Sequence, residues 1–442
     1  MSKKNSFISI NLSEKIPYKL EIKERNTLQL TKGIIVGTIP LDSLILELVN
    51  FLKIESSNII FSTNENDDIY VHINHQITNT TNEIVELLLQ TISFELPHTL
   101  KNKDTKKPLT YVTEELIGFP LIGSFYIGII DRGTNLLQVR SITGCPLNCP
   151  FCSVDEGPAS STKLRDFIVD PDYLVQSYDY VVKEKGLKKA EAHLDGQGEP
   201  MSYPYLLELI QKISENNSTN IISLQTNGWY LNDEIITDLA EVGLTRINLS
   251  LNSLDLTKAK KLSGRGDYPL ERIMNFASTI IDSGISLLIA PLWISQVNDE
   301  DIEEIIKFIA KISPKVNRFP ILGIQNYLTH SEGRNIKGLK SLTFSEFNQK
   351  LKSFEEKYAV KDLLLKQEMF ETQKTKMIAN PFHKNEITFA EIIFPGRIEK
   401  EVIAKAKNRL IHITNAFTAN IGKTVKIKIT RNKHNIFFGE IL

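Results

Sequence analysis

The feature that most constrains this chain is a tight group of cysteines. Cys145, Cys149 and Cys152 are the three cysteines of the 442-residue sequence, and they follow a C-x3-C-x2-C spacing. Thiolates this close together can converge on one inorganic centre, and their odd number and tight spacing argue against a disulfide. A four-iron cluster with three cysteine ligands keeps one iron open for chemistry, whereas a cluster with four usually only carries electrons.

A structural zinc site is the alternative interpretation of the same cysteines. It needs a fourth ligand, for which His193 is the best candidate in the sequence. Structural zinc sites, however, usually show two separated pairs of ligands. The residues around the cysteines must therefore distinguish the two interpretations.

Composition describes an ordinary globular chain. Hydrophobic residues make up 41% and charged residues 24%, with a formal net charge of −1. This charge gives no general attraction to nucleic acid or membrane. The sequence has no run near the ~18 apolar residues of a membrane span and no apolar signal segment at its N-terminus. We therefore expect a cytoplasmic protein, where thiols stay reduced and an iron–sulfur cluster persists.

The region 126–330 has a regular alternation of predicted strands and helices. Six strands alternating with helices of this length predict parallel βαβ units, either in an incomplete (β/α)6 barrel or in an open sheet. The strands are predicted at 136–143, 190–195, 220–226, 246–251, 285–293 and 318–325. The helices are predicted at 171–185, 205–215, 233–242, 270–283 and 299–311.

Unusual residues follow the carboxyl ends of these strands, where α/β folds place their sites. The first strand runs into the cysteine loop, and the second is followed by 195–200, Asp-Gly-Gln-Gly-Glu-Pro. The third ends in Thr226-Asn227-Gly228, and the fourth reaches Ser250 and Asn252. Each motif alone is common turn chemistry, but their order and placement make the set specific.

In this order the motifs resemble those of the radical S-adenosylmethionine (SAM) superfamily. The cysteine spacing with Phe151 before the last cysteine matches the signature of that family, and Gly198-Glu199-Pro200 is similar to its Gly-Gly-Glu-Pro element, with Gln197 in place of the first glycine. The segment 246–255 resembles the branch that contains the molybdenum-cofactor biosynthesis enzyme. The resemblance covers about 190 residues and implies a partial (β/α)6 barrel.

The resemblance also implies cofactors and ligands. Cys145, Cys149 and Cys152 would hold a single 4Fe-4S cluster, whose open iron chelates SAM. Gly198 and Glu199 would hold the SAM amino group, Thr226 and Ser250 its methionine and ribose parts, and Phe151 its adenine. An external one-electron donor would drive cleavage of SAM to a 5′-deoxyadenosyl radical.

No residue of the sequence stands out as the catalytic group for the substrate. The candidates are Arg246, Asn252 and Asp195. Period-two alternation places Arg246 and Asn252 on the strand face of Ser250, so both are expected to line a substrate cavity if Ser250 faces it. Asp195 shares a face of the second strand with His193. The alternatives are that Arg246 lies exposed at the far end of its strand and that His193 is an ordinary core histidine.

The flanking regions are less informative. Residues 1–125 are predicted to form an α+β domain, with strands near 19–23 and 68–73 and helices at 41–52 and 83–92. Its role is substrate presentation, partner binding or structural support. Residues 331–394 are predicted as a helical connection, with a helix at 342–358 and with 333–334 near the mouth of the active site.

The segment 395–442 is strongly basic. Ten lysines and arginines face three acids, an excess of seven positive charges. Strands predicted at 401–406, 409–414, 424–430 and 435–441 indicate a small β-barrel of the OB or TRAM type, which in other proteins commonly binds RNA. Phe417, Phe437 and Phe438 are candidates for stacking on bases; the alternative is a solvated β-domain with these phenylalanines in its core.

Two functions agree with these features. The first is modification of tRNA or other RNA by a radical SAM enzyme; the second is radical chemistry on a small molecule in cofactor biosynthesis. With no further cysteine, a second thiolate-bound cluster and methylation through a methylated cysteine are disfavoured. Rearrangement, dehydrogenation, epimerisation and radical attachment to a second molecule remain.

Overall fold

The computed structural model describes residues 8–24, 26–312, 318–416 and 420–442. The chain divides into two compact units, Met1–Thr110 and Tyr111–Leu442. The N-terminal unit is thus shorter than the predicted domain 1–125, and the remaining predicted domains belong to one unit. Within the described residues, none of the helices combines the length and hydropathy needed to cross a membrane.

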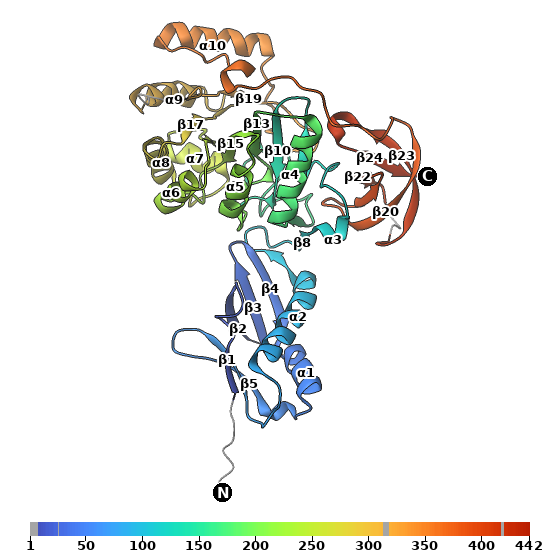
Figure 1. Ribbon diagram of the computed structural model, residues 1–442. Helices are drawn as coiled ribbons and strands as arrows, with labels where there is room; N and C mark the ends of the chain where they lie inside the picture. Colours follow the sequence, from blue (N-terminus) through green and yellow to red (C-terminus); the bar gives the residue numbers. More distant parts are fainter. Residues whose placement is uncertain (1–7, 25, 313–317, 417–419) are drawn as a thin grey trace. The chain divides into compact units, whose positions relative to one another are not determined.

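The N-terminal unit is an α+β domain, coloured blue in Figure 1. It contains an antiparallel sheet in the order β2-β3-β4-β7 and a second in the order β1-β6-β5. Strands β2 (Lys19–Lys23) and β6 (Ile69–Ile73) and helix α1 (Leu41–Leu52) lie where the sequence predicted them. Helix α2 (Thr81–Thr99) is longer than predicted: a capping box between Thr80 and Glu83 starts it earlier, and it continues past the predicted end at 92.

The core of the second unit is a sheet of six strands in the order β17-β16-β15-β13-β10-β9. Neighbouring strands follow sequence order and pair in parallel from β10 to β17, whereas β9 pairs antiparallel with β10. This sequential order confirms the partial barrel over the doubly wound open sheet. The strands are β9 (Gly128–Asp131), β10 (Leu136–Arg140), β13 (Ala190–Leu194), β15 (Thr219–Thr226), β16 (Arg246–Leu249) and β17 (Ser286–Ile289).

Helices connect the strands as predicted. Each presents one apolar stripe for burial; in α8, for example, Ile273, Ala277 and Ile280 recur at helical spacing and are buried. Helix α4 begins at an Asp170 cap and ends at Gly186 in the left-handed conformation. The helices are α4 (Pro171–Lys185), α5 (Leu206–Ser214), α6 (Asp233–Glu241), α8 (Leu270–Asp282) and α9 (Asp299–Ile312). Helix α10 (Phe344–Tyr358) follows the core.

The predicted sixth strand is largely wrong. Only β19 (Gln325–Asn326) is regular, and it pairs in parallel with β18 (Leu292–Trp293). Before β19 the chain still runs beside β17, since the Ile289 amide donates to the Ile321 carbonyl and the Gly323 amide donates to the Ile289 carbonyl. Pro320 lacks an amide hydrogen, which limits regular pairing here.

The C-terminal region forms a closed barrel, as the sequence predicted, but with five strands in place of the four predicted (Figure 1). Its first strand was missed, because β20 lies within the stretch predicted as a helical connection. The barrel therefore begins before the predicted boundary at 395. The strands are β20 (Ile387–Pro395), β21 (Val402–Ala406), β22 (Arg409–Thr414), β23 (Thr424–Arg431) and β24 (Phe438–Ile441).

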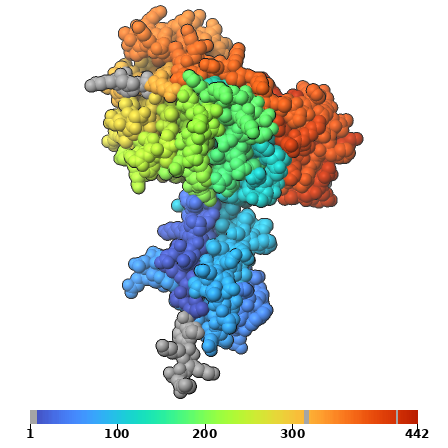
Figure 2. Space-filling model, viewed as in Figure 1, coloured from blue at the N-terminus to red at the C-terminus, as the bar shows by residue number. Residues whose placement is uncertain are grey.

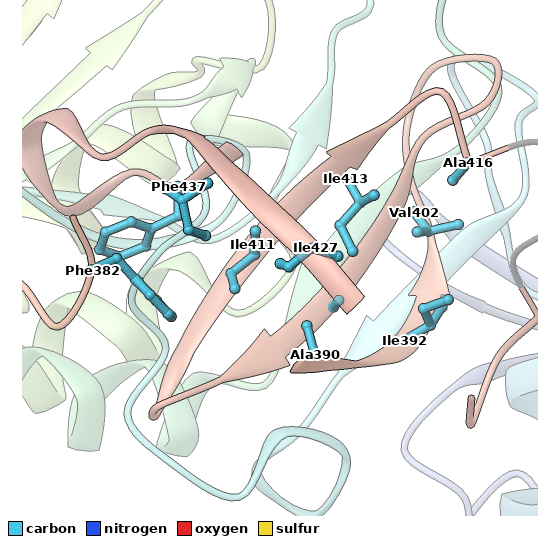
Figure 3. Packing of buried hydrophobic residues seen from close by; sticks show 11 residues of the cluster. Phe382, Ala390, Ile392, Val402, Ile411, Ile413, Ala416, Ile427 and Phe437 are labelled. Atoms are coloured by element: carbon cyan, nitrogen blue, oxygen red, sulfur yellow. The ribbon is translucent and has the colours of Figure 1, made fainter. Parts of the chain in front are cut away.

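The core of the barrel contains one of the phenylalanines predicted to stack on RNA. Phe437 is fully buried against Phe382, with rings 5.0 Å apart (Figure 3). Phe438 is half-buried, and its ring stacks on His412. Phe417 lies outside the described residues. The predicted stacking role is therefore wrong for Phe437, because its side chain completes the apolar core.

Strand β22 faces the core of the C-terminal barrel on one side. On the other side it contacts residues 122–126, which precede β9 of the six-stranded sheet. The Leu410 amide donates to the Ile122 carbonyl and the Phe437 amide to the Gly123 carbonyl. Gly123 has a φ of +118°, and a Cβ there would lie 2.3 Å from the Leu410 oxygen. Figure 2 shows the red barrel directly against the cyan part of the core. The two parts of this unit are therefore closely packed.

Candidate active site

A cavity of about 580 Å³ opens at the carboxyl ends of the parallel strands. Its lining includes the three cysteines and residues that follow β13, β15, β16 and β17. Of the residues predicted to hold SAM, it includes Phe151, Gly198, Glu199, Thr226 and Ser250. The fold thus brings together the motifs that are separated by about a hundred residues in the sequence.

The cysteine loop is held by hydrogen bonds to sulfur. The amides of Leu147 and Glu156 lie 3.4 Å from Cys145 Sγ and 3.3 Å from Cys152 Sγ. Asn227 Nδ2 is 3.5 Å from Cys145 Sγ. Such donors stabilise thiolate charge, so the loop is suited to metal ligation.

The donor set fits a 4Fe-4S cluster. Burial, with the neighbouring Cys149 and Glu199, raises the pKa of Cys145 well above its usual value; burial and Cys152 raise the pKa of Cys149 to about 12. Three adjacent, half-buried thiolates repel one another, so a cationic iron centre would stabilise them together. The chain has no fourth cysteine, so one iron would remain open.

The zinc alternative depends on His193 as the fourth ligand. His193, the proposed fourth ligand, lines the cavity, but its Nδ1 lies 2.7 Å from Ser223 Oγ. Burial lowers its pKa, so the ring is neutral near pH 7.

Helix α7 (Leu256–Ser263) supports the cysteine loop and was missed in the sequence. The Ser263 carbonyl accepts from the Asn148 amide and lies 3.9 Å from Cys149 Sγ. A Cβ on Gly264 would come within 2.3 Å of the Asn148 oxygen. Asp255 at the N-cap and Gly264 after the last turn are helix boundary signals that the sequence does contain.

Glu199 is the buried carboxylate of the site. Its Oε1 accepts from the Met201 amide and the Thr226 hydroxyl, and its Oε2 accepts from the Asn227 amide at 2.8 Å. Burial raises its pKa to about 7, although these hydrogen bonds act in the opposite direction. A carboxylate has about four acceptor positions, so one is left for a ligand ammonium group.

The backbone around Glu199 accommodates the departure at Gln197. Residues 197–198 form β14 (Gln197–Gly198), which pairs in parallel with β11 (Thr143–Gly144) at the entrance to the cysteine loop. Gly198 has a φ of +153°, and a Cβ there would lie 2.0 Å from the Gly144 oxygen. The position that requires a glycine is therefore 198, and a glutamine at position 197 is compatible with the pairing of β14 and β11.

The other predicted SAM contacts also face the cavity. Thr226 is buried, and its hydroxyl is engaged with Glu199, which makes it a group that orients the carboxylate. Ser250 Oγ accepts from Gln225 Nε2 at 2.9 Å. Phe151 packs against an apolar cluster that contains Leu262 and Tyr327, so this side of the cavity offers an apolar wall.

Two of the three catalytic candidates line the cavity. Asp195 is paired with Arg140, Nε to Oδ1 3.1 Å, and also accepts from Gln138. Burial alone would raise its pKa, but the charge of Arg140 and the hydrogen bonds from Arg140 and Gln138 outweigh this and lower it. Asn252 accepts from the Leu292 amide at 2.8 Å. Both side chains are thus held in place by the protein.

Arg246 is not among the lining residues, so its predicted place in the substrate cavity is wrong. It is only 3% exposed and forms an ion pair with Glu191. Its guanidinium carbon lies 4.6 Å from the ring centre of Phe319 and 5.1 Å from that of Phe370. As the first residue of β16 it lies at the amino end of the strand, opposite the cavity, and closes that end of the barrel.

The chain after β19 supplies further lining residues. Tyr327 and His330 line the cavity, and the Arg334 amide donates to the Cys152 carbonyl at 2.8 Å. A Cβ on Gly333 would lie 2.6 Å from that same oxygen. The segment 333–334 therefore contacts the cysteine loop; the contributions of Tyr327 and His330 carry no sequence signal.

Comparison with known proteins identifies the family. Residues 139–309 match the model of the radical SAM superfamily. This part of the chain is a radical SAM domain. Members of the superfamily are enzymes, and the family implies a 4Fe-4S cluster and SAM as cofactors. The matched segment includes the three cysteines, Glu199, Thr226 and Ser250.

Relatives of this radical SAM enzyme extend over the whole chain or over its core. The uncharacterized protein MJ0103 of Methanocaldococcus jannaschii is 40% identical over 91% of this chain and 96% of its own length. A GTP 3′,8-cyclase of Clostridium botulinum is 27% identical over 46% of this chain and 60% of its own. The structure of SuiB from Streptococcus suis bound to S-adenosylmethionine is 16% identical, with a TM-score of 0.36, over 77% of this chain and 70% of that one.

Proposed function

We propose that this radical SAM enzyme cleaves SAM reductively and abstracts hydrogen from an RNA substrate. The observation that carries the first part is the single cavity that three thiols and the Glu199 carboxylate share. When bound, the cluster and SAM supply a 5′-deoxyadenosyl radical, with the electron taken from an external donor.

The chain's own residues bind and orient. Cys145, Cys149 and Cys152 hold the iron, and the free acceptor position of Glu199 takes the SAM ammonium group. Thr226 and the Asn227 amide keep that carboxylate in one orientation. Burial of these groups excludes water, which protects a reactive carbon radical from side reactions.

The RNA proposal rests on one side of the C-terminal barrel. Strand β23 and its ends carry Lys423, Lys426, Lys428, Arg431 and Lys433; the one acid opposite them on β24 is Glu440, which pairs with Lys428 across the ladder. Across the ladder, Phe389 of β20 pairs with Lys426 and is 65% exposed. We call Phe389 and these five basic residues the β23 face. An exposed aromatic ring among cations suits stacked bases and phosphates.

The charge available for RNA is smaller than the sequence count implies. Arg397 and Arg409 are buried, so they belong to the interior. Lys407 is paired with Glu386. The proposed contact is therefore the β23 face and not the whole basic segment.

Chemistry on a small molecule is the second candidate. The cavity has a volume typical of a small-ligand site, and its lining residues include no lysine or arginine in the described part of the chain. Gln225, Asn252 and neutral His193 offer hydrogen bonds there. A substrate that is polar but carries no phosphate would suit this lining.

Anaerobic reconstitution with iron and sulfide, followed by reduction with SAM present, tests the chemistry. Formation of 5′-deoxyadenosine that is lost in Cys149→Ala supports it. Stoichiometric zinc without iron would overturn it. Iron incorporation without product calls for repeating the assay with RNA, because cleavage is often coupled to substrate.

RNA binding is tested with a labelled single-stranded oligonucleotide at several salt concentrations. The triple variant Lys423→Glu, Lys426→Glu, Lys428→Glu is expected to reduce the salt slope by about 2, at about 0.7 per phosphate contact. Phe389→Ala should weaken binding, whereas Phe344→Ala, at an equally exposed position on α10, should not. Point variants are needed because deleting 395–442 would also remove the buried Arg397. If all variants bind the oligonucleotide equally, the RNA proposal is contradicted and chemistry on a small molecule is the function that remains.

A further inference from the structure

Arg397 is a fully buried cation in the connection between β20 and β21 of the barrel. Its guanidinium binds both carboxylate oxygens of Glu156, with Nη2 to Oε2 at 3.0 Å. Nη2 also donates to Asp166 Oδ1 at 2.6 Å, and Nε donates to the Arg165 carbonyl. A buried arginine is stable only when it is paired in this way, so Arg397 fixes the groups around it.

Glu156 links this arginine to the metal site. It follows Cys152 by four residues, lines the cavity, and its amide donates to Cys152 Sγ at 3.3 Å. Arg334 holds the other side of the same turn, since its amide donates to the Cys152 carbonyl and its guanidinium to the Glu156 carbonyl. The turn from 152 to 156 is therefore fixed from two distant parts of the chain.

Arg397 is itself held by the barrel. Glu401 Oε2 accepts from the Arg397 amide at 2.8 Å. The same carboxylate accepts from the Tyr126 hydroxyl and lies 2.9 Å from His412 Nδ1. The Arg397 carbonyl accepts from the Leu164 amide at 2.7 Å. These buried contacts leave the side chain little freedom to move.

We propose that Arg397 is a positioning residue for the iron ligand Cys152. By fixing the carboxylate of Glu156, it keeps the Glu156 amide directed at the Cys152 sulfur. Hydrogen bonds to cluster sulfurs help to set the reduction potential, and outer partners of metal ligands affect retention of the metal. The C-terminal barrel thus supports the metal site directly, apart from any contact with RNA.

The first test uses the apoprotein. Alkylation of each cysteine by iodoacetamide is followed by mass spectrometry in wild type, Arg397→Lys and Arg397→Met, with Lys352→Met on α10 as the exposed control. We expect Cys152 to react more slowly in the order wild type, lysine, methionine, because loss of the amide donor lowers its thiolate fraction, while the control matches wild type. Equal acceleration at Cys145 and Cys152 would indicate general loosening and overturn the proposal.

The second test uses the reconstituted protein. The midpoint potential, measured by spectroscopic titration, should become more negative without the hydrogen bond, and iron loss to a chelator should accelerate about tenfold or more. Unchanged potential and alkylation in Arg397→Lys would overturn the proposal even if Arg397→Met fails to fold. The inference rests on the proposed cluster. Because the alkylation test uses apoprotein and needs no cluster, a failure of the positioning role of Arg397 can be distinguished from a failure of the cluster proposal.

Discussion

The Thr226 hydroxyl donates to Glu199 Oε1 over 2.7 Å, which ties the end of β15 to the loop after β13. Both residues are buried, so the carboxylate has one orientation. A buried carboxylate with a raised pKa is costly to keep ionised, and a ligand ammonium group relieves that cost. This relationship makes SAM affinity sensitive to both residues.

Substitution at Glu199 should weaken SAM binding. Glu199→Gln removes the charge facing the ammonium group, for which we expect a loss of about 10- to 100-fold in affinity. Thr226→Val removes one donor and should cost about tenfold or less. Equilibrium dialysis with reconstituted protein measures both, and Thr424→Val on exposed β23 is the control. Wild-type affinity in Glu199→Gln would contradict the assignment.

SAM affinity should fall as the pH falls through 7. The raised pKa of Glu199, about 7, means that the ionised form prevails above that pH and the protonated form below it. Only the ionised form attracts an ammonium group, so the affinity should decrease roughly tenfold between pH 7.5 and 6. The same dialysis over this range, with Glu199→Gln expected to give a flatter profile, tests the assignment. Parallel profiles would assign the titration to another group.

Gly198→Ala should destabilise the protein. The positive φ and the close Gly144 oxygen leave no room for a methyl group, so we expect a loss of about 2 kcal/mol or more in the free energy of unfolding. Gly266→Ala meets nothing within 4 Å and is the matched control. Urea unfolding of the two apoproteins measures the difference. Equal stability would show that the β11–β14 pairing can shift.

Arg246→Met should affect stability and not SAM binding. Glu191 would be left buried without its cation, at a cost of about 3–5 kcal/mol in the free energy of unfolding. The double variant Glu191→Gln, Arg246→Met should recover much of that loss. A weaker SAM affinity without loss of stability would instead restore Arg246 as a residue of the active site.

Local patterns were sufficient for the core fold and for much of the candidate site. The cysteine spacing, the βαβ alternation and the turns after each strand are properties of short segments. Since parallel strands end at one edge of a sheet, they place Cys145, Glu199, Thr226 and Ser250 together. Helix α7 was missed although its caps are visible. Strand β20 was missed because most of it lies before residue 395, where the basic composition that marked the C-terminal domain begins.

The sequence by itself determined the close spacing of the three cysteines, the partial barrel and the presence of a basic β-barrel after it. Only the tertiary structure decided which charges are buried. Arg246 and Arg397 read as ordinary cations in the sequence, yet one closes the amino end of the barrel and the other lies beside the cysteine loop. The reason is physical: burial and ion pairing depend on partners far along the chain, such as Glu156 for Arg397, and no local pattern contains them.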